Sequence, residues 1–214
     1  MSTKLLKNAY KRMFRHYGPL HWWPGETPFE VMVGAILTQN TAWSNVEKAI
    51  ANLKKAKLLE PHKLYRLSPA KLAQRIRPAG FFRLKTKRLR NFLKFLLDEY
   101  EGDIGQLKRQ PLGPLRHKLL AVNGIGPETA DSILLYALDK PIFVVDAYTR
   151  RILHRHHLVK ADATYDAMQE LFMQNLKADV PHYNEYHAQI VNTAKDFCRT
   201  KPRCDHCPLN GVNW

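Results

Sequence analysis

The segment 119–130, which reads LLAVNGIGPETA, constrains this chain more than any other. Gly124, Ile125 and Gly126 separate two apolar stretches, and two glycines around one apolar residue allow a tight turn that approaches another surface closely. Pro127 suits the first position of the second helix, because its missing N–H has no intrahelical partner there. The start of that helix presents free amides and the positive end of the helix dipole. The segment therefore predicts an anion site, or else an ordinary turn between two core helices.

The composition favours a polyanionic partner. The 214 residues include 34 Lys and Arg against 19 Asp and Glu, a net charge of +15, which points to nucleic acid as that partner. A hydrophobic content of 45% and four tryptophans indicate a packed globule rather than a disordered basic arm. The sequence shows no apolar run of membrane-spanning length, no signal-peptide pattern and no secreted disulfide framework. We expect a monomer of the cytoplasm, associated with the nucleoid and without a membrane partner.

Helical periodicity recurs along the chain without a convincing period-two strand, which predicts an all-α fold. Ser44, with Glu47 three residues later, has the pattern of a capping box for a helix over 45–59. The other helices are expected at 1–16, 29–38, from 69 to about 78, 82–100, 111–121, 127–138, 147–157, 163–177 and 181–197.

These motifs resemble the helix-hairpin-helix and Gly/Pro…Asp signature of the endonuclease III superfamily of DNA glycosylases. The signature is GIGPETA at 124–130 followed by Val145 and Asp146; further matches are GAILTQNT at 34–41, GFF at 80–82, Lys85, and KPRC at 201–204 followed by Cys207. The resemblance covers nearly the whole chain. It implies two helical lobes with the DNA and a flipped base in the cleft between them. One lobe is expected at 22–137, with the hairpin at about 116–137, and the other at 1–21 plus 138–214.

The resemblance assigns catalysis to Asp146. Breaking an N-glycosidic bond builds positive charge on the sugar, which a nearby carboxylate stabilises. The carboxylate can also orient or deprotonate the attacking water. Asp146 is in addition a candidate N-cap for the helix that follows it.

Glu128 bears on the reaction type. Bifunctional glycosylase/lyases of this superfamily carry a lysine here, whose amine forms a Schiff base with the sugar. Because a glutamate has no amine, we expect base removal without efficient strand cleavage. Glu128 can border the base pocket, or it can be a solvated acid favoured by the helix dipole.

Trp22, Trp23 and Trp43 predict an aromatic base pocket, because a flipped base is gripped by stacking and a cationic purine gains further from π-density. Trp-Trp-Pro and an aromatic residue after TQNT are similar to the 3-methyladenine DNA glycosylase III branch. The tryptophans can instead be core residues. The expected substrate is double-stranded DNA with a damaged, alkylated purine; the alternatives are a uracil/thymine mismatch glycosylase and a non-catalytic lesion binder.

Gln39 and Phe81 match the positions that probe the duplex in this superfamily. An apolar wedge there offsets part of the cost of unstacking the bases, although either side chain can instead be packed. The residues expected at the DNA are Gly124, Ile125, Gly126 and Thr129 of the hairpin, together with the basic residues Lys85, Lys87, Arg88, Arg90, Arg150 and Arg151.

No cofactor is expected for catalysis. In this superfamily the hairpin carbonyls often bind a monovalent cation that bridges to a DNA phosphate. By that resemblance, the carbonyls of Leu120, Val122 and Ile125 are the candidate ligands.

The tail departs from the superfamily pattern. Iron–sulfur members carry four cysteines, whereas this chain has Cys198, Cys204 and Cys207, with Asn213 where a fourth is expected. Three thiolates leave one iron open. A cluster, a zinc site completed by His206 or another histidine, and a basic loop without metal all remain alternatives.

Overall fold

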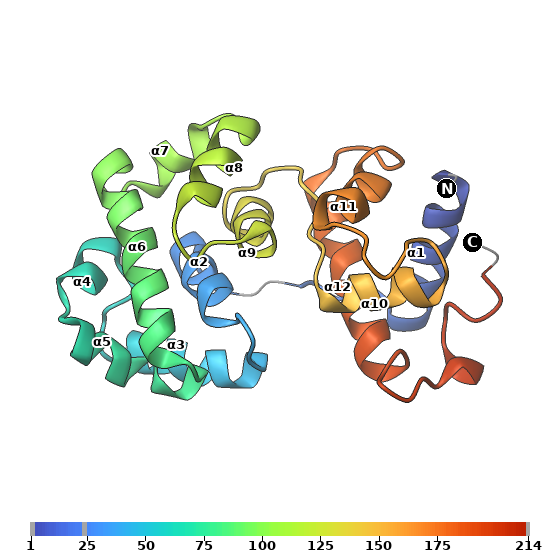
Figure 1. Ribbon diagram of the computed structural model, residues 1–214, viewed down its shortest axis with the longest axis horizontal. Helices are drawn as coiled ribbons and strands as arrows, with labels where there is room; N and C mark the ends of the chain where they lie inside the picture. The colour runs from blue at the N-terminus through green and yellow to red at the C-terminus, as the bar shows by residue number, and fades with distance from the viewer. Residues whose placement is uncertain (1–2, 23–24, 213–214) are drawn as a thin grey trace. The chain divides into compact units, whose positions relative to one another are not determined.

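The computed structural model describes residues 3–22 and 25–212, and every regular element in those ranges is helical (Figure 1). The all-α prediction is confirmed. The chain divides into two compact units: unit 1 combines Met1–Trp22 with Pro141–Trp214, and unit 2 is Trp23–Lys140. The sequence placed these divisions after residues 21 and 137. Trp23, which was predicted for the base pocket, and Asn213, which stands where a fourth cysteine is expected, lie outside the described residues.

Unit 2 is built around α2 (Pro28–Leu37), in which every residue from Phe29 onward is buried. Thr27 caps this helix by accepting a hydrogen bond from the Glu30 N–H. The buried Glu30 carboxylate lies 2.9 Å from the Lys54 ammonium, which provides the charged partner that a buried acid needs. The remaining elements of unit 2 are α3 (Trp43–Lys55), α4 (Pro61–Arg66), α5 (Pro69–Arg75), η1 (Arg77–Ala79), α6 (Phe82–Tyr100), α7 (Ile104–Arg109), α8 (Leu112–Ala121), α9 (Pro127–Ser132) and the π-helical turn η2 (Ile133–Ala137).

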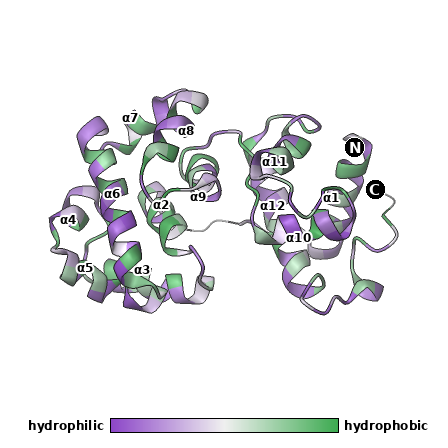
Figure 2. Cartoon of the chain, viewed as in Figure 1, coloured by the Kyte–Doolittle hydropathy of each residue, from purple (hydrophilic) through white to green (hydrophobic). Residues whose placement is uncertain are grey.

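The long helix α6 has the amphipathic pattern expected from its sequence. Hydrophilic and hydrophobic segments alternate along it (Figure 2). Its buried face carries Leu89, Phe92, Leu93 and Leu96 and packs against α2, α4 and α5. This packing makes α6 the scaffold that holds the neighbouring segments of unit 2.

The predicted capping box at Ser44 is wrong. Helix α3 begins two residues earlier than predicted, at Trp43, and its cap residue Ala42 contributes no side-chain hydrogen bond. The Trp43 ring packs against Gly34 of α2, so tertiary packing outweighs the local capping signal. The short helices α4 and α7 were not predicted, because six residues are too few to show a helical period.

Unit 1 has an aromatic core between its helices. These helices are α1 (Thr3–Tyr17), α10 (Ala147–Arg155), α11 (Tyr165–Met173), α12 (Val180–Asp196) and the short η3 (Cys204–His206). The Phe143 and Phe172 rings stack at 3.9 Å, and Tyr186 lies edge-on to both. The Tyr186 hydroxyl donates to the Leu6 carbonyl at 2.8 Å, which ties α12 to α1. Within the described parts of the chain, no helix has the length and apolar character needed to cross a membrane.

Candidate active site: a helical hairpin and a capping carboxylate

An ion pair joins the two helices of the hairpin, α8 and α9. Arg116 of α8 donates from Nε and Nη2 to the two carboxylate oxygens of Asp131, at 2.8 and 3.1 Å. Asp131 is fully buried, and such a two-bond pair is both strong and directional. Removing one partner of a buried pair typically costs about 3–5 kcal/mol. The pair therefore holds α8 and α9 in one arrangement.

The turn between α8 and α9 requires glycine at only one of its two glycine positions. Gly124 has φ +98°, and a Cβ added there would lie 2.3 Å from Cγ of Arg88. Gly126 is the N-cap of α9, with φ −93°, and a Cβ there would meet nothing within 4 Å. Gly124 thus allows the turn to pack against α6, whereas Gly126 leaves open space in front of the α9 N-terminus.

This difference leads to a testable prediction. We expect Gly124→Ala to lower the free energy of unfolding by about 1–3 kcal/mol, because the added methyl group overpacks against Arg88 in a left-handed backbone. Gly126→Ala serves as the control and should have the smaller effect, because the added methyl group meets nothing there and only the preference of an N-cap for glycine over alanine is lost. Urea unfolding of both variants measures the difference. Equal losses would show that the turn does not depend on the close approach at Gly124.

Gln39 holds the hairpin turn in this structure. Its Nε2 donates to the Gly124 carbonyl and to the Thr129 hydroxyl, both at 3.0 Å, and its Oε1 accepts from Arg88. The Thr129 and Ile125 side chains, expected at the DNA, are buried, so only the backbone of these two residues can face a partner. Any probing of a duplex by Gln39 must break the contacts that it makes here.

Phe81 has the geometry that a wedge requires. Its side chain is 67% exposed, and its backbone lies in the left-handed region at φ +43°. That conformation is strained for a bulky residue, and such strain concentrates at functional sites. Leu84, one turn further along α6, is also exposed. Two apolar side chains therefore project from the start of α6, while the wedge role of Phe81 itself stays a prediction.

The phosphate contact predicted for Lys85 is wrong. Lys85 is 1% exposed, and its Nζ donates to the carbonyls of Leu37 and Ala79, both at 2.7 Å. Burial, together with repulsion from Arg88, lowers the pKa of Lys85 to about 8. The side chain therefore fastens α6 to the ends of α2 and η1 and does not reach solvent.

Several of the other predicted basic contacts are also engaged within the protein. Arg90 donates to the carbonyls of Tyr65 and Leu67. Arg150 donates to the Ala163 carbonyl at 2.8 Å. A guanidinium has five donors, so these bonds orient each arginine without using all of its capacity to bind phosphate.

In unit 1, α11 holds the loop that leads to Asp146. Gln169 donates to the Phe143 carbonyl at 2.6 Å, and the Tyr165 hydroxyl accepts from the Val145 N–H at 3.3 Å. Asp146 then forms the N-cap of α10, where its Oδ1 accepts from the Thr149 N–H at 2.7 Å and the Thr149 hydroxyl at 2.9 Å. The loop and the cap together fix the position of the carboxylate.

The electrostatics keep Asp146 ionised. Its side chain is only 14% exposed, and Oδ2 lies 3.6 Å from Nε2 of His187 on α12. Burial raises the pKa of Asp146, but the attraction of His187 and the hydrogen bonds from Thr149 outweigh it, so this pKa lies below its ordinary value. The sequence carries no signal for His187, because the pattern of a helix does not indicate a partner so distant in the chain.

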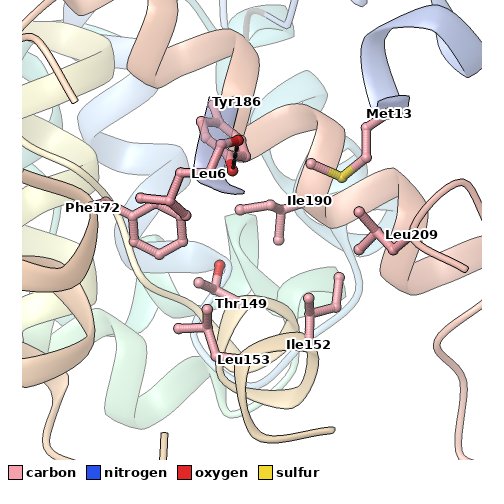
Figure 3. A pocket seen from close by; sticks show the side chains of 9 residues that line it. All are labelled: Leu6, Met13, Thr149, Ile152, Leu153, Phe172, Tyr186, Ile190 and Leu209. Atoms are coloured by element: carbon pink, nitrogen blue, oxygen red, sulfur yellow. Dashed lines mark hydrogen bonds between the residues drawn. The ribbon is translucent and has the colours of Figure 1, made fainter. Parts of the chain in front are cut away.

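A small cavity lies on the core side of α10 (Figure 3). Its volume is about 10 Å³, and its walls include Thr149, Phe172 and Tyr186. A space of this size holds at most about one water molecule. It is a packing void of unit 1 and cannot accept a nucleobase.

The residues predicted for the base pocket lie in different units. Trp22 is half-buried in unit 1, with the Lys195 ammonium 5.7 Å from its ring centroid. Trp43 is half-buried in unit 2 against Gly34. Glu128 is exposed in the first turn of α9. These side chains are thus not all core residues.

The cysteines of the tail do not fit a metal centre. Cys198 is buried and accepts a hydrogen bond from Arg155 at 3.3 Å, whereas Cys204 is exposed. In the described ranges, no three His, Cys, Asp or Glu side chains are grouped so that they could hold a metal ion. The iron–sulfur and zinc alternatives for Cys198, Cys204 and Cys207 are therefore not supported. Arg155 also donates to the carbonyls of Arg199 and Thr200, which holds the tail.

Residues 33–178, more than half of the chain, match the model of the HhH-GPD superfamily base excision DNA repair protein. The chain belongs to this superfamily. It is therefore a DNA glycosylase of the helix-hairpin-helix type, and the resemblance seen in the sequence is confirmed.

Individual proteins that are similar to this chain carry names that agree with this family assignment. The chain is 50% identical over 208 residues to "Putative DNA repair glycosylase MJ1434" of Methanocaldococcus jannaschii, covering 96% of this chain and 94% of that protein. The crystal structure of the H. pylori 3-methyladenine DNA glycosylase bound to 1,N6-ethenoadenine is 30% identical, with TM-score 0.78, covering 91% of this chain and 98% of that one. A non-covalent endonuclease III–DNA complex shares the fold at 20% identity, with TM-score 0.83, covering 99% and 95% of the two chains.

Proposed function

We propose that this HhH-GPD protein is a monofunctional DNA glycosylase that removes damaged, alkylated purines from double-stranded DNA in base excision repair. The observation that carries this proposal is the Asp146 carboxylate, which is held ionised by Thr149 and His187 at the start of α10. A protein that only bound lesions would have no need of a carboxylate kept negatively charged at this position. Similarity to a 3-methyladenine glycosylase supports the substrate class.

The mechanism follows from the charge on Asp146. As the N-glycosidic bond breaks, its electron pair leaves with the base and the sugar becomes cationic. The carboxylate stabilises that cation, and it accepts the proton that water loses as it bonds to the sugar carbon. An alkylated purine that carries a positive charge leaves as a neutral base, so this reaction needs no separate acid. The product is an abasic site.

The available amines support a hydrolytic reaction. Glu128, exposed in the first turn of α9, has no amine to attack the sugar. Lys85, whose lowered pKa would suit a nucleophile, is buried and donates to two carbonyls. Because Glu128 has no amine and the Lys85 amine is buried, we propose that the protein has no lyase activity.

The hairpin is proposed to bind the DNA backbone. The open space at Gly126 allows a phosphate to approach the α9 N-terminus, and the exposed Phe81 is proposed to enter the duplex. The carbonyls of Leu120, Val122 and Ile125 remain candidates for a monovalent cation. The Val122 carbonyl accepts the Ile125 N–H, which leaves its second lone pair for such an ion.

Base recognition is proposed to rest on Trp22 and Trp43. A uracil or thymine glycosylase instead requires amide groups that read a pyrimidine edge, and the Gln39 amide is already engaged with Gly124 and Thr129. Lys195 lies close to the Trp22 ring, so a neutral base stacks there at lower electrostatic cost than a cationic one. Cationic and neutral purine lesions therefore both need to be tested.

The proposal is tested with duplexes that each carry 3-methyladenine, 1,N6-ethenoadenine, hypoxanthine, uracil or 8-oxoguanine. We expect release of an alkylated purine, and we expect Trp43→Ala to weaken lesion-specific binding by about 1–3 kcal/mol, the usual contribution of a stacked base. Release of uracil alone would favour the mismatch alternative. Tight binding of lesions without release of any base would favour the non-catalytic alternative. Unchanged discrimination in Trp43→Ala would exclude Trp43 from the base pocket.

A further inference from the structure

The Asp146 carboxylate is held at both oxygens, by two different helices. Thr149 of α10 donates twice to Oδ1, which is what an N-cap alone requires. Oδ2 takes no part in the cap and faces Nε2 of His187 on α12 at 3.6 Å. This second contact is not needed to start the helix.

His187 is the ionisable partner that α12 brings to this carboxylate. The side chains of Asp146 and His187 are 14% and 8% exposed, so their interaction is little screened by water. The two arginines nearest in α10 are directed elsewhere, since Arg150 donates to the Ala163 carbonyl and Arg151 to the Ala194 carbonyl.

The buried residues of the third helix in this region carry no charge. Helix α1 packs against α12, and its buried residues are Leu6, Ala9 and Met13, all apolar. Burial disfavours a charged carboxylate, and Thr149 can offset that cost at one oxygen only. His187 offsets it at the other oxygen.

We propose that His187 is a positioning residue for Asp146, which fixes the orientation of the carboxylate and keeps it charged for base release. This inference rests on the proposed function of Asp146. His187 lies beyond ordinary hydrogen-bond length, so it acts here through electrostatic attraction; contacts of this kind often shorten when substrate binds. The role of His187 can be tested separately from the N-cap, because His187 faces Oδ2 and the cap uses Oδ1.

The first test follows the Asp146 carboxyl carbon by NMR across a pH titration, in the absence of DNA. The resonance is assigned by its loss in Asp146→Asn. In His187→Leu we expect the pKa of Asp146 to rise by about one unit or more, because burial remains while the attraction is lost. His187→Gln, which retains an N–H donor, should restore part of the shift. His182→Leu is the matched control on α12 and should leave the titration unchanged.

The second test measures single-turnover base release against pH. In His187→Leu the acid limb of the profile should move to higher pH by the same amount as the Asp146 titration, since fewer molecules carry the ionised carboxylate at each pH on that limb. Affinity for the duplex should stay within a few-fold. A folded His187→Leu variant with an unchanged Asp146 titration and an unchanged profile would overturn the proposal.

If His187→Leu does not fold, the wild-type protein and Asp146→Asn still decide the question. The ring-nitrogen resonances of His187 should shift in Asp146→Asn if the two side chains interact, and unchanged resonances would overturn the proposal. The titrations need no substrate. A wild-type protein that releases no base would therefore contradict the proposed function, while the link between His187 and Asp146 would be tested separately.

Discussion

Asp146→Asn is expected to reduce base release by at least about a hundredfold, the usual effect of losing one preorganised electrostatic group. The neutral amide cannot stabilise the sugar cation or accept a proton from water. Asparagine is as good an N-cap as aspartate, so its carbonyl oxygen can still accept from Thr149 and the start of α10 is preserved. Duplex affinity should change by no more than a few-fold, since the phosphate contacts are unaffected. Single-turnover base release and fluorescence anisotropy measure the two quantities.

Unit 1 offers a matched control for this substitution. Asp179 caps α12 in the same way, accepting from the His182 N–H at 2.7 Å. Asp179→Asn therefore makes the same chemical change at another capping aspartate and should leave base release unchanged. Equal losses of release in the two variants, or equal losses of release and binding in Asp146→Asn, would show that Asp146 serves the fold and not the chemistry.

Local sequence patterns predicted a feature correctly where the contacts that define it lie within one segment of the chain. The glycines of the hairpin and the cap at Asp146 are local features, and the structure has the turn and the cap where the sequence predicts them. Helix α5 likewise begins at Pro69, as the sequence predicts, and the Ser68 side chain caps it. The capping box at Ser44 was wrong because the deciding contact, Trp43 on Gly34, joins two helices.

Lys85 is a buried residue within a run of basic residues. It lies four and seven residues before Leu89 and Phe92, on the buried face of α6, so the helical period did carry a signal of its burial. Its partners, the carbonyls of Leu37 and Ala79, belong to other segments and could not be deduced from the pattern. The contact of His187 with Asp146 was missed for the same reason.

The wild-type protein should not be trapped covalently on damaged DNA by borohydride. Trapping requires a Schiff base between an amine and the sugar, and Glu128 supplies no amine. Lys85 is too buried to replace it, despite a pKa near 8. Reaction with a lesion duplex followed by gel electrophoresis should therefore show no covalent adduct. Strand breaks should appear only after alkali or heat has opened the abasic site.

Substitutions at Glu128 make this prediction specific. Glu128→Lys places an amine in the exposed first turn of α9, where bifunctional members of the superfamily carry their lysine, so trapping should rise above the wild-type background. Glu128→Gln has no amine and should remain untrapped while it still releases the base, which controls for the loss of the negative charge. A lysine elsewhere, for example Lys140, could supply the missing amine, and Lys140→Ala would test that residue if the wild-type protein were trapped. Efficient trapping of the wild-type protein would overturn the monofunctional assignment, whichever base it removes.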